Sequence, residues 1–142
     1  MKVMITDGGR KEAGYKSKKS GDCVCRAISI ATEKDYQEVY DTLNELAEKE
    51  RPRNGKKRSN SNTGVYKPTI KKYMESIGWT WVPTMKIGTG CQVHLKKEEL
   101  PKGRLVVSVS KHLVAVIDGV IHDNHDPSRN GTRCVYGYWK KN

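Results

Sequence analysis

Apolar and polar residues follow two rhythms along the chain, a helical one in the first half and a strand-like one in the second. Residues 23–31 (CVCRAISIA) are apolar nearly all round, which is typical of a buried helix. A second helix is expected over 36–50, because Asp35 and Glu38 match a capping box and apolar residues then recur at helical spacing. A third is expected over 68–77, which starts with proline and is followed by glycine.

From residue 104 onward, short runs rich in β-branched residues predict strands. The expected strands are 104–110, 112–117, 120–123 and 132–139, with a short one near the start at 3–6. Helices followed by strands predict an α+β fold in which N-terminal helices pack on a mostly antiparallel sheet. At roughly 100 to 200 residues per domain, a chain of 142 residues is expected to form a single domain.

A predicted hairpin brings two polar residues together. Asp118-Gly119 is a strong signal for a two-residue turn in which both residues take positive φ. This turn pairs Ala115 with His122, so His112 and Asp123 share one face of the hairpin. Their backbones then lie roughly 7 to 8 Å apart, within reach for a carboxylate that orients an imidazole.

Cys23 is the candidate nucleophile, because it stands at the predicted start of the first helix. The free N–H groups and dipole of a helix N-terminus lower the pKa of a thiol, and a neighbouring imidazolium lowers it further. The same N–H groups can donate to an oxyanion. Cys25 is the competing choice, but two residues along a helix it points about 200° away, toward the packed side.

Two parts of the chain resemble papain-like cysteine peptidases. Residues 23–29 (CVCRAIS) resemble the nucleophile helix of this superfamily, especially that of ovarian-tumour-type deubiquitinases. Residues 109–117 (VSKHLVAVI) and 119–123 (GVIHD) resemble its histidine strand, turn and acid strand, including those of bacteriocin-processing peptidases. The whole chain also resembles small prokaryotic and phage-type proteins that share the segments HLVAVIDGVIHD and VYGYW.

This resemblance implies a papain-like fold and a cysteine protease or related thiol hydrolase. Cys23 would be the nucleophile, His112 the general base and acid, and Asp123 the acid that orients His112. The expected substrate is a peptide or protein with a peptide, isopeptide or related amide bond, and no cofactor is expected.

Three further residues are candidates for oxyanion-binding or supporting roles. Papain-like enzymes place a glutamine that binds the oxyanion six residues before the nucleophile, and Ser17 occupies that position. Asp22 directly precedes Cys23, where its charge opposes thiolate formation unless Arg26 or a backbone N–H takes it up.

The net charge of +11 favours a different partner, a polyanion. Residues 49–72 hold nine basic residues and one acid, and their small polar and turn-forming neighbours predict a mobile, solvated basic loop at about 51–62. The alternative function is therefore a catalytically silent papain-like scaffold. It would contact nucleic acid or an acidic partner through a basic set: Arg51, Arg53, Lys56, Lys57 and Arg58.

The four cysteines, at positions 23, 25, 91 and 134, are too few for a disulfide framework in a chain of this length, so free thiols are expected. No apolar stretch approaches the ~18 residues of a membrane span, and the N-terminus lacks the apolar region of a signal peptide, so a cytoplasmic protein without membrane contact is expected. Cys23, Cys25, Cys91 and His94 could supply zinc ligands, but Cys-x-Cys within a helix aims its sulfurs apart. No metal site is expected.

Overall fold

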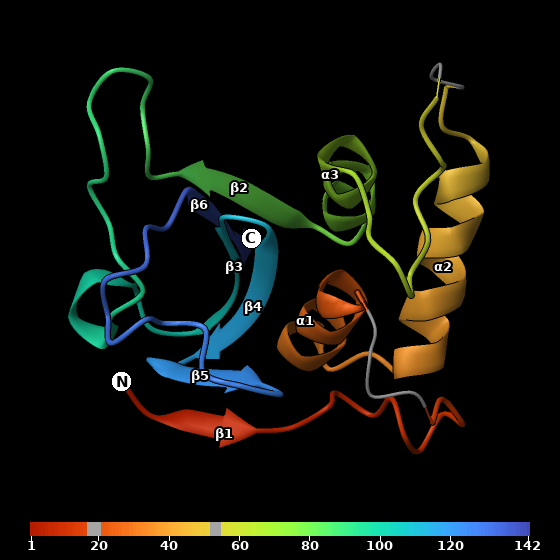
Figure 1. The fold of residues 1–142 in the computed structure, drawn as a ribbon, viewed down its shortest axis with the longest axis horizontal. Coiled ribbons are helices and arrows are strands. Elements are labelled where there is room, and N and C mark those ends of the chain that lie inside the picture. Colours follow the sequence, from red (N-terminus) through yellow and green to blue (C-terminus); the bar gives the residue numbers. More distant parts are fainter. Residues whose placement is uncertain (17–20, 52–54) are drawn as a thin grey trace.

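Three helices pack against a six-strand, mostly antiparallel open sheet in the computed structural model, which describes residues 1–16, 21–51 and 55–142 (Figure 1). This confirms the predicted α+β class. A single 3-10 turn, η1, precedes the central strands. The elements in chain order are β1 (Val3–Ile5), α1 (Cys23–Thr32), α2 (Tyr36–Glu48), α3 (Lys67–Ser76), β2 (Trp79–Pro83), η1 (Lys97–Glu99), β3 (Arg104–Val109), β4 (His112–Ile117), β5 (Val120–Asp123) and β6 (Gly137–Lys141).

The strands lie in the order β1-β5-β4-β3-β6-β2. β4 and β5 form the predicted hairpin, in which Ala115 pairs with His122, and the turn residues Asp118 and Gly119 have φ angles of 48° and 79°. The predicted register and turn are therefore confirmed. β1 pairs with β5 in parallel, and the other strand pairs are antiparallel.

The C-terminal part of the sheet differs from expectation. β2 was not predicted, and it pairs with β6 along its whole length. The last strand, expected over 132–139, lies instead at Gly137–Lys141. The residues before it follow another loop, because the Val135 N–H donates to the Val93 carbonyl at 2.8 Å and Cys134 forms a bridge with His94.

The sheet separates two apolar cores. Figure 1 shows α1 between the sheet and α2, and in this core Ile28 of α1 is buried with Val106 and Ala115 of the sheet. On the other face, Val107 and Val114 pack in a second core, which includes residues of the loop around η1. α1 packs against the sheet on one side and against α2 on the other, so its first residue, Cys23, is held at a defined place beside β4.

Candidate active site

Cys23, His112 and Asp123 come together where α1 meets the β4–β5 hairpin. Cys23 is the first residue of α1, His112 the first of β4 and Asp123 the last of β5. His112 Nε2 lies 2.7 Å from Asp123 Oδ2, and the His112 side chain also lowers the pKa of the nearby Cys23 thiol. Because Nε2 faces Asp123, Nδ1 is the ring nitrogen left for Cys23. The three residues predicted to form a triad thus occupy one site in the predicted order.

The electrostatics of these residues favour a thiolate–imidazolium pair. Burial opposes charge on each group, but the His112 hydrogen bond and the charge of Arg26 lower the pKa of Asp123 below its ordinary range. Burial is likewise overcome at His112, where the hydrogen bonds to Asp123 and Cys23 raise the pKa to about 9. The His112 hydrogen bond and charge, helped by the Leu113 amide, lower the pKa of Cys23.

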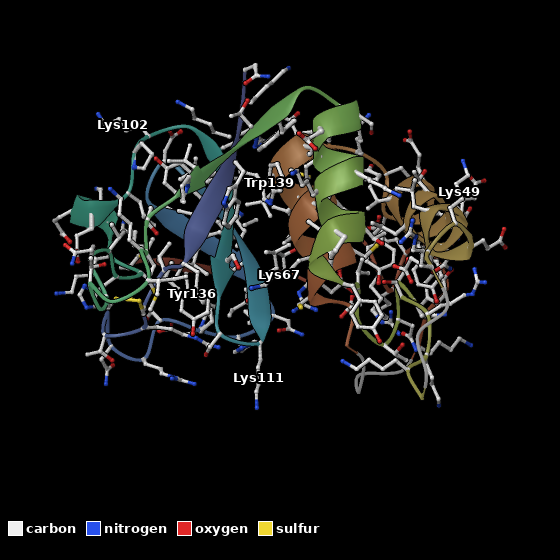
Figure 2. The ribbon with its side chains drawn as sticks, turned by 90° about the horizontal axis from the view of Figure 1, so that it is seen from above. Lys49, Lys67, Lys102, Lys111, Tyr136 and Trp139 are labelled. Atoms are coloured by element: carbon white, nitrogen blue, oxygen red, sulfur yellow. A yellow bond between two sulfur atoms is a disulfide. The ribbon has the colours of Figure 1, made fainter. Side chains whose placement is uncertain are left out.

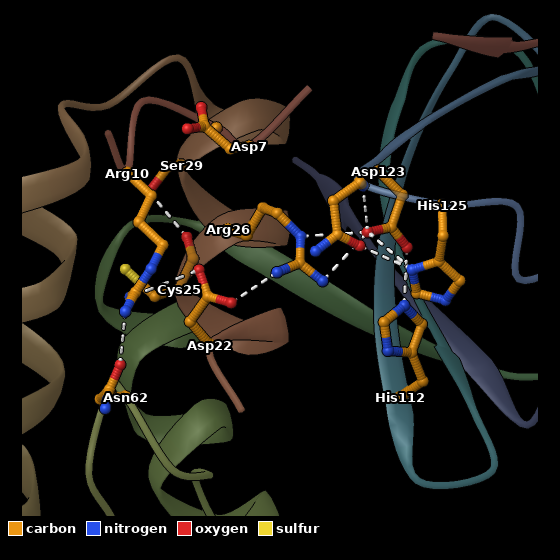
Figure 3. Close-up of polar contacts among 12 residues, drawn as sticks. Asp7, Arg10, Asp22, Cys25, Arg26, Ser29, Asn62, His112, Asp123 and His125 are labelled. Atoms are coloured by element: carbon orange, nitrogen blue, oxygen red, sulfur yellow. Dashed lines mark hydrogen bonds and ion pairs between the residues drawn. The ribbon is translucent and has the colours of Figure 1, made fainter. Parts of the chain in front are cut away.

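Arg26 lies between two buried carboxylates (Figure 3). Its Nε lies 3.0 Å from Asp123 Oδ1, and its Nη1 lies 2.5 Å from Asp22 Oδ1. The charge of Asp22 is therefore taken up by Arg26, as the sequence required for a thiolate at Cys23. The contact between Arg26 and Asp123 was not predicted, and it links the nucleophile helix to the acid of the hairpin.

A second shell of polar side chains extends this network away from Cys23. Tyr36 donates its hydroxyl to Asp22 Oδ2 at 2.8 Å, and Arg10 donates to the Tyr36 oxygen at 2.9 Å. The other arm of Arg10 donates to Asn62 at 2.8 Å. These residues come from the N-terminal loop, α2 and the end of the basic loop, so spacing along the sequence gave no signal for them.

The first turn of α1 offers backbone donors near the thiol. The Asp22 carboxylate, at the N-cap position, binds Arg26 and Tyr36 rather than the first-turn amides. Amides at a helix N-terminus have no carbonyl partner within the helix, so they can receive a developing oxyanion. Ser17, the other predicted oxyanion residue, lies outside the described residues.

The remaining cysteines have other roles. Cys25 is fully buried beside the Tyr36 carbonyl, and burial raises its pKa to about 12, in agreement with its predicted inward direction. Cys91 and Cys134 form a disulfide, so the expectation of four free thiols was wrong. Register with the 93–95 segment brings these two residues together, which cysteine spacing does not reveal. The disulfide also removes Cys91 from the alternative zinc ligand set.

One group in the described part of the chain has the geometry of a cation site. His112, Asp123 and His125 place one potential ligand atom each within 4.8 Å of one another. A cation there would face the Arg26 guanidinium, which already occupies Asp123 Oδ1, and would compete with the proton that the raised pKa keeps on His112. This charge distribution suits a proton-carrying histidine better than a metal.

A mainly apolar cleft of about 540 Å³ lies between α3 and the sheet. Leu113, which follows His112, lines this cleft, and its amide helps to lower the pKa of Cys23. Ile70, Trp81 and Trp139 contribute much of the remaining apolar wall. The cleft therefore adjoins the end of β4 that carries His112.

The predicted basic loop borders a separate groove of about 450 Å³. Four of the five predicted cations line it (Arg51, Lys56, Lys57 and Arg58), whereas Arg53 lies outside the described residues.

The end of this loop is not solvated as expected. Ser59 and Ser61 are buried, and their backbone N–H groups donate to Glu50 and Asn44. The Arg58 guanidinium donates to backbone carbonyls at the end of α2. Side-chain acceptors on and after α2 thus order residues whose composition alone indicates a loop.

Comparison of the chain with protein-family models, with curated proteins and with solved structures finds no match. Within the described residues, no helix is long and apolar enough to cross a membrane. The cytoplasmic location stays a prediction, and the Cys91–Cys134 disulfide weighs against it because disulfides persist mainly in oxidising compartments. Function must therefore be argued from the geometry and charge of the site.

Proposed function

We propose that this protein is a papain-like cysteine hydrolase that cleaves amide bonds in peptides or proteins. The observation that carries the proposal is the position of His112, which lies 2.7 Å from the Asp123 carboxylate and lowers the pKa of the Cys23 thiol. A nucleophile, a base and a group that orients the base are the three parts that thiol acyl transfer requires.

The proposed reaction has two halves, formation of an acyl-enzyme on Cys23 and its hydrolysis by water. The Cys23 thiolate attacks the carbonyl carbon, and first-turn amides of α1 receive the oxyanion. The His112 imidazolium protonates the leaving amine as the C–N bond breaks, which leaves a thioester on Cys23. Neutral His112 then takes a proton from water, whose oxygen attacks the thioester, and the acid product and the Cys23 thiol are released. Asp123 keeps the ring oriented and favours its charged form.

The alternative of a catalytically silent scaffold that binds a polyanion draws on the cationic groove alone. It gives no reason for a buried chain of ions that ends on a thiol. A base held by an acid next to a thiol is what thiol acyl transfer requires, so this arrangement favours the enzyme.

Alkylation by iodoacetamide tests the proposal. At pH 6 the Cys23 thiolate should react at least about tenfold faster than glutathione, because its lowered pKa leaves more thiolate at that pH. His112→Ala should remove this advantage, while Cys25→Ser is the matched control and should keep it. Equal rates for wild type and His112→Ala would refute the ion pair. If the ion pair holds, a panel of fluorogenic amides, with Cys23→Ala as the blank, identifies the bonds that the enzyme cleaves.

A further inference from the structure

The apolar cleft that adjoins the His112 end of β4 carries positive charge at its rim. Lys67 and Lys71 of α3 line it together with the apolar residues, and the lining residues that the structure describes include no acid. Lys67 lies 5.9 Å above the Tyr136 ring, across the space between α3 and the sheet, as Figure 2 shows. A ligand in this cleft would therefore meet an apolar floor and an ammonium group at its edge.

The cationic groove begins where the cleft ends. Pro68, in the first turn of α3, lines both spaces, so the same helix end separates them. Six basic residues line the groove: Lys49, Arg51, Lys56, Lys57, Arg58 and Lys72. Glu50, the one acid among the described lining residues, accepts hydrogen bonds from Ser59 and Thr69. The uncompensated charge of the groove is thus positive.

We infer that the substrate of this site is an acidic polypeptide segment that carries a bulky apolar residue. The apolar side chain occupies the cleft beside Leu113, and neighbouring aspartates or glutamates lie along the cations of the groove. This inference rests on the proposed function, because the cleft is assigned to substrate through Leu113, which lines it and directly follows His112.

Charge complementarity favours an acidic polypeptide over a nucleic acid. Nucleic-acid affinity comes largely from a row of regularly spaced phosphates, and it needs no aliphatic pocket. Here the cations adjoin a cleft walled by Ile70, Leu113 and Trp139, and Leu113 follows His112 of the proposed triad. An alternating apolar and acidic chain uses both surfaces, whereas a phosphate backbone uses one.

Fluorescence anisotropy with the full chain carrying Cys23→Ala tests the inference. The probe is a fluorescein-labelled peptide in which a glycine-flanked leucine lies between two runs of three aspartates, so either chain direction can bind. Affinity should fall about tenfold, or about 1.4 kcal/mol, when leucine is replaced by alanine in the probe. It should fall at least as much in Lys72→Glu, and Lys102→Glu, which makes the same change of charge away from α3 in Figure 2, is the matched control.

Two results would overturn the inference. One is equal binding of the leucine and alanine probes, and the other is tighter binding of an oligothymidylate of the same charge. Iodoacetamide alkylation of the wild type, run in parallel, separates this failure from failure of the proposed function. Retained dependence on His112 with no peptide selectivity refutes the substrate class alone, whereas lost dependence on His112 refutes the hydrolase.

Discussion

The charge of Asp123 should set the pH range in which Cys23 is reactive. Burial lowers the pKa of His112, yet its hydrogen bonds to Asp123 and Cys23 raise it from 6.5 to about 9. That difference corresponds to about 3 kcal/mol in favour of the imidazolium, at about 1.4 kcal/mol per pH unit. Asparagine at position 123 keeps an oxygen that accepts from the His112 N–H but removes the charge. It thereby separates the electrostatic effect from orientation.

In Asp123→Asn, the pKa of His112 is expected to move from about 9 toward 6.5, and the pKa of Cys23 should rise because its imidazolium partner is lost at lower pH. For each pH unit that the Cys23 pKa rises, the thiolate fraction at pH 6 falls tenfold, so we expect iodoacetamide alkylation at pH 6 to slow by about tenfold or more. NMR titration of the His112 ring measures the first shift directly. As the pH rises, amide hydrolysis by Asp123→Asn should be lost near pH 7 rather than near pH 9, because the variant His112 gives up its proton at lower pH.

Glu99→Gln is the matched control. It removes a carboxylate from another histidine, because His94 Nδ1 lies 3.2 Å from Glu99 Oε1, outside the triad. Its His112 titration and Cys23 alkylation should equal those of the wild type. An unchanged His112 titration in Asp123→Asn would refute the role assigned to the Asp123 charge.

Three further predictions concern stability. Arg26→Leu leaves two buried carboxylates without their guanidinium and should lower the free energy of unfolding in urea by about 3 to 5 kcal/mol, and a loss under about 1 kcal/mol would contradict the network. Reduction of the Cys91–Cys134 disulfide by dithiothreitol should lower Tm, and its separation of 43 residues corresponds to a loss of up to about 4 kcal/mol in the free energy of unfolding. In Cys91→Ser, which lacks the disulfide, dithiothreitol should leave Tm unchanged. Gly119→Ala should cost about 1 to 2 kcal/mol in the same urea assay, because φ is 79° there, and an unchanged midpoint would argue against the hairpin turn.

Most elements of the fold are predictable from local signals. The N-cap at Asp35 is formed, since its side chain accepts from the Glu38 N–H, and the hairpin turn has both positive φ angles. The errors occur where long-range pairing decides. β2 (WTWVP) has no clear alternation and ends in proline, and it is a strand because β6 supplies its partners. The 133–135 segment pairs with the 93–95 loop, which no periodicity indicates.

The site divides in the same way. The hairpin register brings His112 and Asp123 together and a helix start marks Cys23, because both are local signals, whereas the resemblance to papain-like peptidases joined Cys23 to the other two. For Asp22, the sequence left Arg26 and a backbone N–H as alternative partners, and the structure shows Arg26. Its other contact, with Asp123, spans 97 residues and depends on how α1 packs against the sheet.

Asp22 illustrates why the second contact matters. Taken alone, a carboxylate next to Cys23 opposes the thiolate. In the folded chain it binds Arg26, which in turn binds Asp123, and the charges alternate in sign from Asp22 to the imidazolium of His112. Each buried charge thus has an opposite neighbour, which offsets the cost of desolvation.

The direction in which this network shifts the pKa of Cys23 follows from the order of its charged residues. Arg26 keeps Asp123 ionised, Asp123 keeps His112 protonated, and His112 lowers the pKa of Cys23. Removal of any link should therefore reduce both stability and thiol reactivity. This coupling distinguishes a network that serves the thiol from one that only fills the interior, because the latter would change stability without moving the pH dependence of Cys23 alkylation.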